Sequence, residues 1–206
     1  MNISFPIYGI LTLGIGYLLG SIPSGYLAGK WLVGIDLRLK GSGSTGATNV
    51  LRHVGKWPAL IVFLTDVTKG VLPVLIARTF LLNDFWQVFA GLTALIGHIW
   101  PIWLGWKGGK AVATGLGVLL GLSWNVGLAC LGIFLSVLSI SRIVSLSSVV
   151  AAISLPFLMF LSFQENSFKV AYLSFSFITM AIVLWRHRSN LHRLLTGNEP
   201  KIGKSR

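Results

Sequence analysis

The first group of residues suited to chemistry lies in a polar stretch between two long apolar runs. Residues 41–49 read Gly-Ser-Gly-Ser-Thr-Gly-Ala-Thr-Asn, and Arg52 follows. Glycines let backbone N–H groups approach an anion, and hydroxyls add donors, so the stretch suits phosphate binding. A flexible linker has a similar composition, but Thr48, Asn49 and Arg52 fall at helical spacing, which a linker does not need. The stretch lacks the Gly-Lys-Ser/Thr ending of a P-loop. The candidate phosphate ligands here are Gly41, Ser42, Gly43, Gly46, Thr48, Asn49 and Arg52.

A second group follows Gly97-His98 and reads Trp-Lys-Gly-Gly-Lys at residues 106–110. Two lysines flank a pair of glycines just before a helix that we expect to begin at Ala111. Helix N-termini with nearby lysines attract anions. A charged loop that only sets membrane topology is the alternative, although topology alone needs no glycines. The candidate ligands are Lys107, Gly108, Gly109 and Lys110.

The third group reads Arg-His-Arg-Ser-Asn at residues 186–190, with Arg193 beyond it. His187 and Asn190 are three positions apart and therefore share a face if the segment is helical. Arg186 adds a positive charge. The alternative is a polybasic segment that binds anionic lipid.

The acidic residues are too few and too scattered for several other kinds of site. The chain has five Asp and Glu in total, with no carboxylate cluster for a metal and no Ser-His-acid set. We therefore expect no metal and no cofactor. Asp66 and Lys69, at i and i+3 within an apolar run, either neutralise each other or line a site. Cys130 is the only cysteine, which excludes an intrachain disulfide.

The composition places these groups in a membrane protein. Of 206 residues, 54% are hydrophobic and 11% are charged, whereas soluble domains carry about 25% charged residues. The net charge of +12 would suggest nucleic acid in a soluble protein. Here the basic residues lie between apolar stretches, so membrane topology and phosphate-bearing partners explain them better.

The apolar stretches predict an all-α integral membrane protein. They cover residues 3–29, 57–77, 85–106, 111–163 and 168–185, and Pro23 interrupts the first. The 31 residues between Lys110 and Arg142 would give about 46 Å of helix, too little for two crossings of about 30 Å each. We expect a short re-entrant helix pair there, turning near residues 121–125. With five full spans, this makes a seven-helix bundle.

The positions of Lys and Arg predict the orientation. With the N-terminus outside and the C-terminus in the cytoplasm, fourteen of these residues lie on the inside and two on the outside, as the positive-inside rule requires. All three polar groups then lie on the cytoplasmic face.

Several motifs, in order over about residues 20 to 201, resemble the bacterial acyl-phosphate:glycerol-3-phosphate acyltransferases of the PlsY type. They are Ser21-Ile-Pro-Ser-Gly25, the Gly-Ser-Gly-x-x-Gly-Ala-Thr-Asn run, Asp66-x-x-Lys-Gly70, Gly-His-x-x-Pro with Trp-Lys-Gly-Gly-Lys, and Arg-His-Arg-x-Asn with Arg-Leu-Leu-x-Gly-x-Glu. The resemblance implies one domain over residues 1–206 and a seven-helix fold. It also implies a monomeric enzyme of the bacterial inner membrane, with its active site facing the cytoplasm.

The reaction implied by the resemblance is transfer of a fatty acyl group from acyl phosphate to the 1-hydroxyl of glycerol 3-phosphate. Lysophosphatidic acid and phosphate are the products, and neither metal nor cofactor is needed. By motif position, the catalytic set is Ser42, Arg52, Lys110, His187 and Asn190, and the other candidates bind phosphate. The chain departs from the usual motifs at Ser44, Ala111, Ser189 and Leu191, which affects loop conformation rather than the reaction.

Three questions stay open at this point. Either His187 or a substrate phosphate oxygen takes the hydroxyl proton. Ser42 either hydrogen-bonds substrate or acts as an acyl-accepting nucleophile. The alternative function is an organic-phosphate membrane transporter, since half-helices with anion-binding ends also suit transporters.

Overall fold

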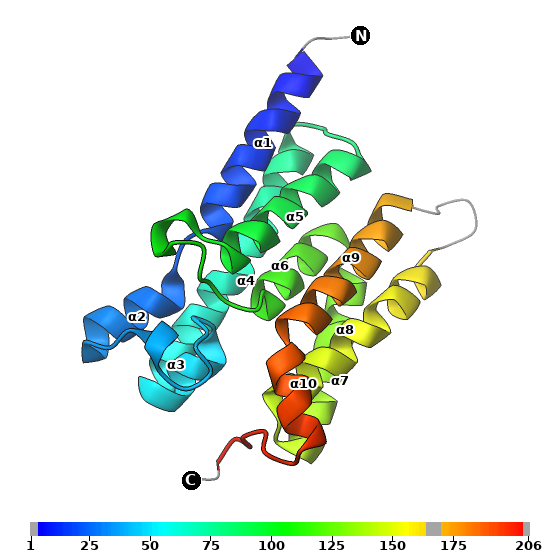
Figure 1. The fold of residues 1–206 in the computed structure, drawn as a ribbon. Helices are drawn as coiled ribbons and strands as arrows, with labels where there is room; N and C mark the ends of the chain where they lie inside the picture. Colours follow the sequence, from blue (N-terminus) through cyan, green and yellow to red (C-terminus); the bar gives the residue numbers. More distant parts are fainter. Residues whose placement is uncertain (1–3, 164–169, 204–206) are drawn as a thin grey trace. The chain divides into compact units, whose positions relative to one another are not determined.

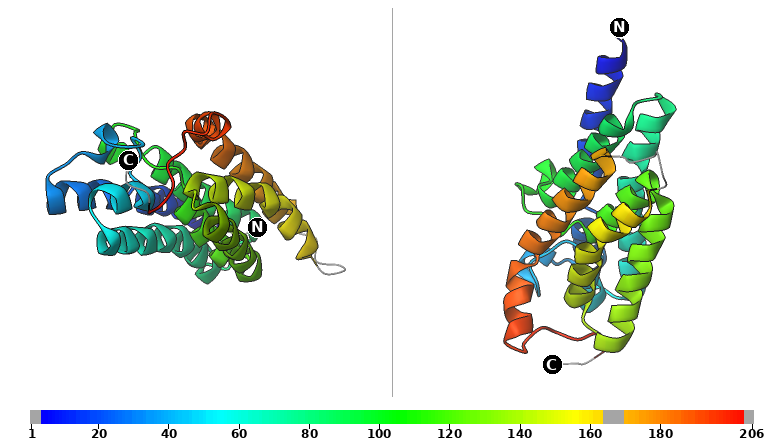
Figure 2. Two further views of the ribbon diagram at one scale, coloured as in Figure 1. Left: turned by 90° about the horizontal axis from the view of Figure 1, so that it is seen from below. Right: turned by 90° about the vertical axis from the view of Figure 1, so that its right-hand side faces the viewer.

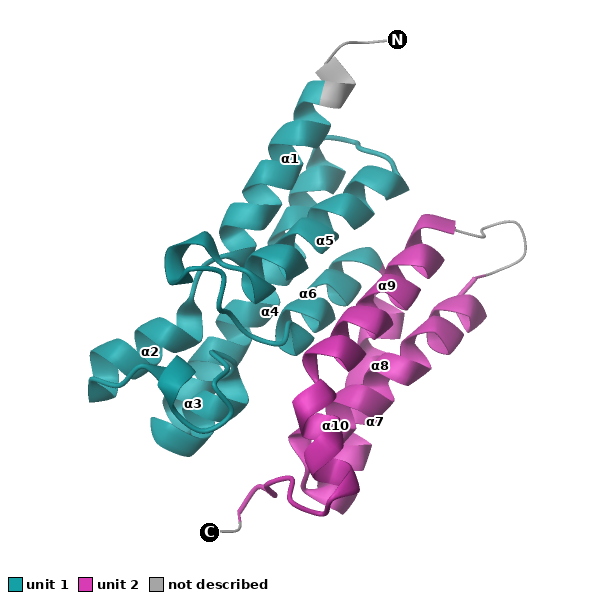
Figure 3. Cartoon of the chain, viewed as in Figure 1, with its two compact units in different colours: residues 1–122 teal, residues 123–206 magenta. Residues whose placement is uncertain are grey.

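The computed structural model describes residues 4–163 and 170–203, which are almost entirely helical (Figure 1). The predicted polar turn at residues 164–169 and the basic residues Lys204 and Arg206 lie outside this part. The chain divides into two compact units, residues 1–122 and 123–206 (Figure 3). Each unit is described by itself, and a single domain over the whole chain remains a prediction.

Within residues 4–122, the part of the first unit that the structure describes, there are six α-helices and two single-turn 3₁₀ helices. They are α1 (Ser4–Gly20), α2 (Ser24–Val33), η1 (Leu37–Leu39), α3 (Ala47–His53), α4 (Lys56–Thr79), α5 (Asp84–Ile99), η2 (Ile102–Leu104) and α6 (Val112–Leu122). Pro23, which lacks a backbone donor, stands at the break between α1 and α2, as the sequence predicts. Asn83 begins α5 by accepting a hydrogen bond from the N–H of Trp86.

Glycines bring the helices of the first unit into close contact. A Cβ at Gly20 of α1 would overlap the backbone of Ala94 in α5, and a Cβ at Gly97 would overlap the backbone of α1. On the other side of the unit, Gly70 of α4 meets Thr114 of α6 in the same way. Close backbone approach through small residues is typical of helix packing in membranes.

The helices confirm an integral membrane architecture. In the described residues, segments 7–33, 56–79, 84–104, 124–141 and 144–161 are long and apolar enough to cross a membrane. The pair formed by α9 (Val170–Arg186) and α10 (Arg188–Leu195) is a sixth if it is counted as one span. Large apolar side chains on these helices are exposed, including Ile10, Ile61 and Phe157, as expected of surfaces that face lipid.

The structure differs from the sequence prediction in the helix pair after Lys110. The turn lies where it was expected, at Ser123, and α6 is short at 11 residues. Its partner α7 (Trp124–Ser141), however, has 18 residues and is long enough to cross. Arg78, in the last turn of α4, donates to the carbonyl of Leu122. The end of α6 is therefore level with the end of α4, and the two helices are unequal in length, where the sequence predicted two half-length helices.

In the second unit, α7, α8 (Val144–Leu161) and α9 lie side by side as an up-and-down bundle (Figure 2). Arg142, with a left-handed φ of 58°, forms the tight turn between α7 and α8. Its carbonyl accepts a hydrogen bond from the N–H of Ile202, which ties the C-terminal segment to this turn. Helix α10 leaves α9 at an angle of 61°, and His187 stands at the bend.

Candidate functional site

Asn49 organises the first polar loop from its centre. Its side chain is 2% exposed, and its amide nitrogen lies 2.9 to 3.1 Å from the carbonyl oxygens of Leu37, Lys40 and Ser44. Its Oδ1 accepts a longer hydrogen bond from the N–H of Ser42. This side chain thus replaces the regular backbone pairing that the loop lacks.

These contacts give Asn49 a structural part, because its amide nitrogen holds the loop. The phosphate-binding role that the sequence predicted for it stays a prediction. The other three candidate side chains of this group are placed differently: Ser42 and Thr48 are half-buried, and Arg52 is exposed on α3. The predicted helical spacing of Thr48, Asn49 and Arg52 is confirmed, since α3 contains all three.

A set of contacts around Arg38 connects this loop with the loop that carries the next polar group. Arg38 forms a two-point ion pair with Asp36, with N–O distances of 3.0 and 2.6 Å, and its guanidinium lies over the ring of Tyr26. Its remaining nitrogen, Nη1, donates to the carbonyl of Leu104 across 3.0 Å. The hydrogen bonds from Arg38 lower the pKa of Asp36 despite the opposing effect of burial. Arg38 therefore connects the two loops of the first unit.

The second polar group folds onto the end of α5. The N–H of Gly109 donates to the carbonyl of His98 across 3.0 Å, and that of Gly108 donates to Ile99 across 3.1 Å. A Cβ at Gly108 would overlap the His98 carbonyl, and one at Gly109 would overlap the His98 ring. Both positions therefore require glycine for close packing. The sequence predicted that these N–H groups bind phosphate, but both already have acceptors within the chain.

The lysines of this group are accessible to different degrees. Lys107 is exposed and Lys110 is half-buried. Ala111, next to Lys110, has a left-handed φ of 59° and is 2% exposed. This conformation explains why glycine suits that position in the motif, because a Cβ is strained there.

A buried polar cluster lies beneath the second group, between three helices. Asp66 is 1% exposed and pairs with Lys69 at 2.7 Å. The same carboxylate oxygen accepts a hydrogen bond of 2.6 Å from the hydroxyl of Ser24, and His98 Nδ1 lies 3.7 Å away. The predicted mutual neutralisation of Asp66 and Lys69 is confirmed. Ser24 and His98 as its neighbours were not predicted, since nothing in their spacing connects them with α4.

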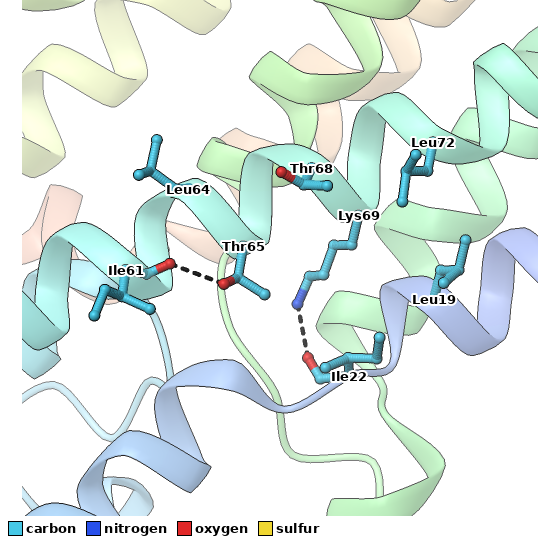
Figure 4. Close-up of a pocket in the computed structure, with 8 residues that line it drawn as sticks. All are labelled: Leu19, Ile22, Ile61, Leu64, Thr65, Thr68, Lys69 and Leu72. Carbon is cyan, nitrogen blue, oxygen red and sulfur yellow. Dashed lines mark hydrogen bonds between the residues drawn. The ribbon is translucent and has the colours of Figure 1, made fainter.

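Lys69 also borders a pocket of about 320 Å³ between the α1–α2 junction and α4 (Figure 4). Its ammonium points to the carbonyl of Ile22, 2.9 Å away. The lining is otherwise mostly apolar: Leu19, Ile22, Ile61, Leu64, Thr65, Thr68 and Leu72. Because the ammonium is held by Asp66 and the Ile22 carbonyl, the pocket is poorly suited to phosphate.

The third polar group belongs to the second unit. His187 is 3% exposed, and its Nδ1 lies 2.8 Å from the carbonyl of Val183. Because a carbonyl only accepts, Nδ1 carries the hydrogen, and Nε2 is the nitrogen that can take up a proton. Asn190 is 4% exposed and donates to Glu199 Oε1 across 2.6 Å. Arg186 is half-buried at the end of α9.

Glu199 is the centre of this group. Besides Asn190, it accepts hydrogen bonds from the hydroxyl of Ser145 on α8 and from Arg193 Nε, at 2.7 and 2.8 Å. Burial alone would raise the pKa of Glu199, but these hydrogen bonds outweigh it and the pKa lies below its ordinary value. Arg193, in the last turn of α10, is the ion-pair partner of Glu199. The part of Ser145 was missed, because a serine within an apolar run carries no sequence signal.

Arg38 thus joins the loops that carry the first and second groups, within one unit. The third group is built around Glu199 in the other unit. A single pocket formed by all three remains a prediction. In the described residues, no group of three His, Cys, Asp or Glu side chains is arranged to hold a metal ion.

Comparison with known proteins gives a consistent result. The sequence model of a family described as "Glycerol-3-phosphate acyltransferase" matches residues 10–197. A protein of that name from Prochlorococcus marinus (strain MIT 9211) is 69% identical over 194 residues, 94% of each chain. Another, from Synechococcus sp. (strain CC9902), is 68% identical over 195 residues, 95% of this chain and 96% of the relative.

Two crystal structures also resemble the chain. Both are of PlsY (YgiH), described as an integral membrane glycerol 3-phosphate acyltransferase. The glycerol 3-phosphate form has a TM-score of 0.88 and 40% identity, with 95% of this chain and 96% of that chain covered. The lysophosphatidic acid form has a TM-score of 0.85 and 39% identity, with 95% of each chain covered.

Proposed function

Because the chain belongs to the glycerol-3-phosphate acyltransferase family, we propose that it transfers a fatty acyl group from acyl phosphate to the 1-hydroxyl of glycerol 3-phosphate. The observation that carries this proposal is the likeness, over 95% of the chain, to an acyltransferase crystallised in a glycerol 3-phosphate form. The comparisons give no support to an organic-phosphate transporter. Lysophosphatidic acid made in this way would serve phospholipid synthesis.

The reaction needs little from the protein beyond positioning of the two substrates and stabilisation of the charge on the leaving phosphate. An acyl phosphate is already activated, so the glycerol hydroxyl oxygen attacks the acyl carbon directly. The bond from that carbon to the phosphate oxygen breaks, and inorganic phosphate leaves with the electron pair. Holding hydroxyl and carbonyl in line supplies much of the rate, and cationic groups stabilise charge on the leaving phosphate.

We assign that electrostatic part to Arg52 and Lys110, with Lys107 and Arg186 as further phosphate ligands. The exposure of Arg52 and Lys107 and the partial exposure of Lys110 support this assignment. Ser42 hydrogen-bonds substrate from the loop held by Asn49. A covalent acyl-Ser42 intermediate would give ping-pong kinetics, whereas direct transfer gives a sequential pattern.

The hydroxyl proton goes to a phosphate oxygen of the substrate, and His187 binds rather than acts as the base. The hydrogen bond from its Nδ1 to Val183 makes Nε2 the acceptor of the ring, which suits the substrate hydroxyl that is not acylated. His187→Gln separates the two routes. A general base contributes about 10²–10⁴-fold, so retention of most of kcat at saturating substrate supports the substrate-assisted route. A loss in that range with KM unchanged would assign the proton to His187.

We also propose that the enzyme is a monomer of the bacterial inner membrane, with its N-terminus outside and its site facing the cytoplasm. The distribution of Lys and Arg supports this orientation. Cysteines placed at position 3 and at position 201 of a Cys130→Ala chain would test it, because a membrane-impermeant maleimide should label only the first from outside.

The function itself is tested by phosphate release from palmitoyl phosphate, with and without glycerol 3-phosphate, in the presence of EDTA. Release that requires both substrates and is accompanied by lysophosphatidic acid supports the proposal. Release without glycerol 3-phosphate would indicate a hydrolase. No turnover by folded protein, together with uptake of labelled glycerol 3-phosphate into proteoliposomes, would replace the enzyme with a transporter.

A further inference from the structure

The buried cluster around Asp66 is connected to the second polar group by a single side chain. The Asp66 carboxylate lies on one side of the His98 imidazole, with its Oδ1 3.7 Å from Nδ1. The opposite nitrogen, Nε2, lies against Gly109, where any Cβ would overlap it. The His98 carbonyl also accepts the Gly109 N–H. His98 therefore lies between the carboxylate and the residue next to Lys110.

The carboxylate is itself held by contacts from two helices, α2 and α4, and through Lys69 it is connected to the α1–α2 junction. Ser24 at the start of α2 donates to it, Lys69 on α4 pairs with it, and Lys69 in turn holds the carbonyl of Ile22. A shift of the Asp66 side chain would therefore break several contacts at once. These contacts, rather than a rotamer preference of Asp66 itself, fix the position of the carboxylate.

The cost of this cluster argues against a purely structural role. Two buried charges in a membrane helix are expensive to desolvate, and apolar residues of similar size often give equal or greater stability. Elsewhere the unit joins α4 to α5 more simply, through Arg78 Nε and Gln87 Oε1 at 3.1 Å. The connection to Gly109 distinguishes the Asp66 cluster from that pair.

We propose that Asp66 is a positioning residue that acts through His98 to hold the loop of residues 107–110, and with it the ammonium of Lys110, against the substrate phosphate. The inference rests on the proposed acyl transfer. Ser24 and Lys69 contribute to the same positioning, since both fix the Asp66 carboxylate.

The main test replaces the pair without leaving a lone buried charge, as Asp66→Asn with Lys69→Met. Arg78→Met with Gln87→Met is the matched control: it removes another polar contact between α4 and α5, far from the loop. Ser24→Ala is the milder variant, and Ser24→Thr, which keeps the hydroxyl, should rescue it. All are full-length proteins in detergent, compared at equal fractions folded as measured by thermal unfolding.

Two readouts separate positioning from stability. Hydrogen exchange of the peptide containing residues 107–110 reports the loop directly, because the N–H groups of Gly108 and Gly109 are bonded to α5. We expect exchange there to be at least tenfold faster in the Asp66 variant and unchanged in the control. We also expect kcat for lysophosphatidic acid formation to fall at least tenfold in the Asp66 variant and less than threefold in the control.

Equal loop exchange, or equal losses of kcat, in the Asp66 variant and the control would overturn the inference. So would failure of Ser24→Thr to restore what Ser24→Ala loses. Inactivity of the wild-type protein would instead refute the proposed acyl transfer, and the exchange measurement would still decide whether Asp66 holds the loop.

Discussion

The side-chain amide of Asn190 donates to Glu199 across 2.6 Å, and this contact joins α10 to the C-terminal segment that follows it. The same carboxylate reaches α8 through Ser145. Glu199 thus orients Asn190, a residue that the sequence predicts to contact substrate. The geometry of the third polar group depends on the charge state of Glu199.

Removing the charge of Glu199 should loosen this unit. In Glu199→Gln, the carboxylate that accepts three hydrogen bonds becomes a neutral amide, and one of its former acceptor positions becomes a donor. We expect a loss of about 2 kcal/mol, since hydrogen bonds to a charged group are the stronger kind. Thermal unfolding in detergent at pH 7 measures it, and Gln164→Glu, outside the described residues, serves as a charge-change control.

The same residue predicts a response to acid. The pKa of folded Glu199 is lowered, so its contribution is complete above the ordinary glutamate pKa and is lost as the pH falls through the folded value. The wild-type melting temperature should therefore fall more steeply below about pH 4.5 than that of Glu199→Gln. Parallel curves would contradict this assignment.

Asn49→Ala should damage the first loop. It removes the donor to three backbone carbonyls, and we expect a loss of about 2–3 kcal/mol because these groups become unsatisfied. Thr48→Ala is the comparison: a change in KM for either substrate with little change in stability would identify Thr48 as a ligand. If Asn49→Ala kept its stability and changed only KM, Asn49 would be a substrate ligand rather than the residue that holds the loop.

Gly109→Ala should impair activity much more than folding. The added methyl group would overlap the His98 ring, so the loop must shift, and an error of about 1 Å in a catalytic group can cost 10²-fold. Gly132→Ala is the control, because a Cβ there meets nothing within 4 Å and alanine favours the helix by about 0.5–1 kcal/mol. Steady-state kinetics of both variants make the comparison.

Ala111→Gly should stabilise the protein. Ala111 has a φ of 59°, a left-handed conformation that costs a residue with a Cβ about 1–2 kcal/mol. Part of the gain is cancelled by the greater freedom of glycine in the unfolded chain, so we expect about 1 kcal/mol, or roughly 2–4 °C in Tm. Ala113→Gly, within α6, should instead destabilise by about 1 kcal/mol.

Much of the fold could be predicted because its determinants are local in sequence. Apolar run length located the spans, Pro23 located the break between α1 and α2, and the turn at Ser123 followed from the polar residues around it. The length of α7 was misjudged because Lys110 and Arg142 were both placed at the membrane surface. The structure has a loop from Trp100 to Ala111 and a helix α7 of 18 residues, and charge positions alone do not give the length of a helix.

The site was predicted as a list of residues but not as a set of contacts. Glycine, serine and lysine content predicted three polar segments, and the structure places the first two in loops and the third at the bend between α9 and α10. Which side chains face a ligand and which hold the loop depends on contacts between distant segments, such as Arg38 with Leu104 or Ser24 with Asp66. Asn49 illustrates the difficulty, because an amide that binds phosphate and one that binds three carbonyls look identical in sequence.

The pairing of α6 with the later part of α4 has a consequence for where water must reach. Asp66 is ten residues beyond Lys56 in α4, about 15 Å along the axis at 1.5 Å per residue, and His98 places Gly109 near that level. This is half the thickness of a hydrocarbon core of about 30 Å. If Lys56 lies at the membrane surface, Asp66 and the loop packed on His98 lie near the middle of the hydrocarbon core, and a hydrophilic substrate would need a water-filled path to that depth.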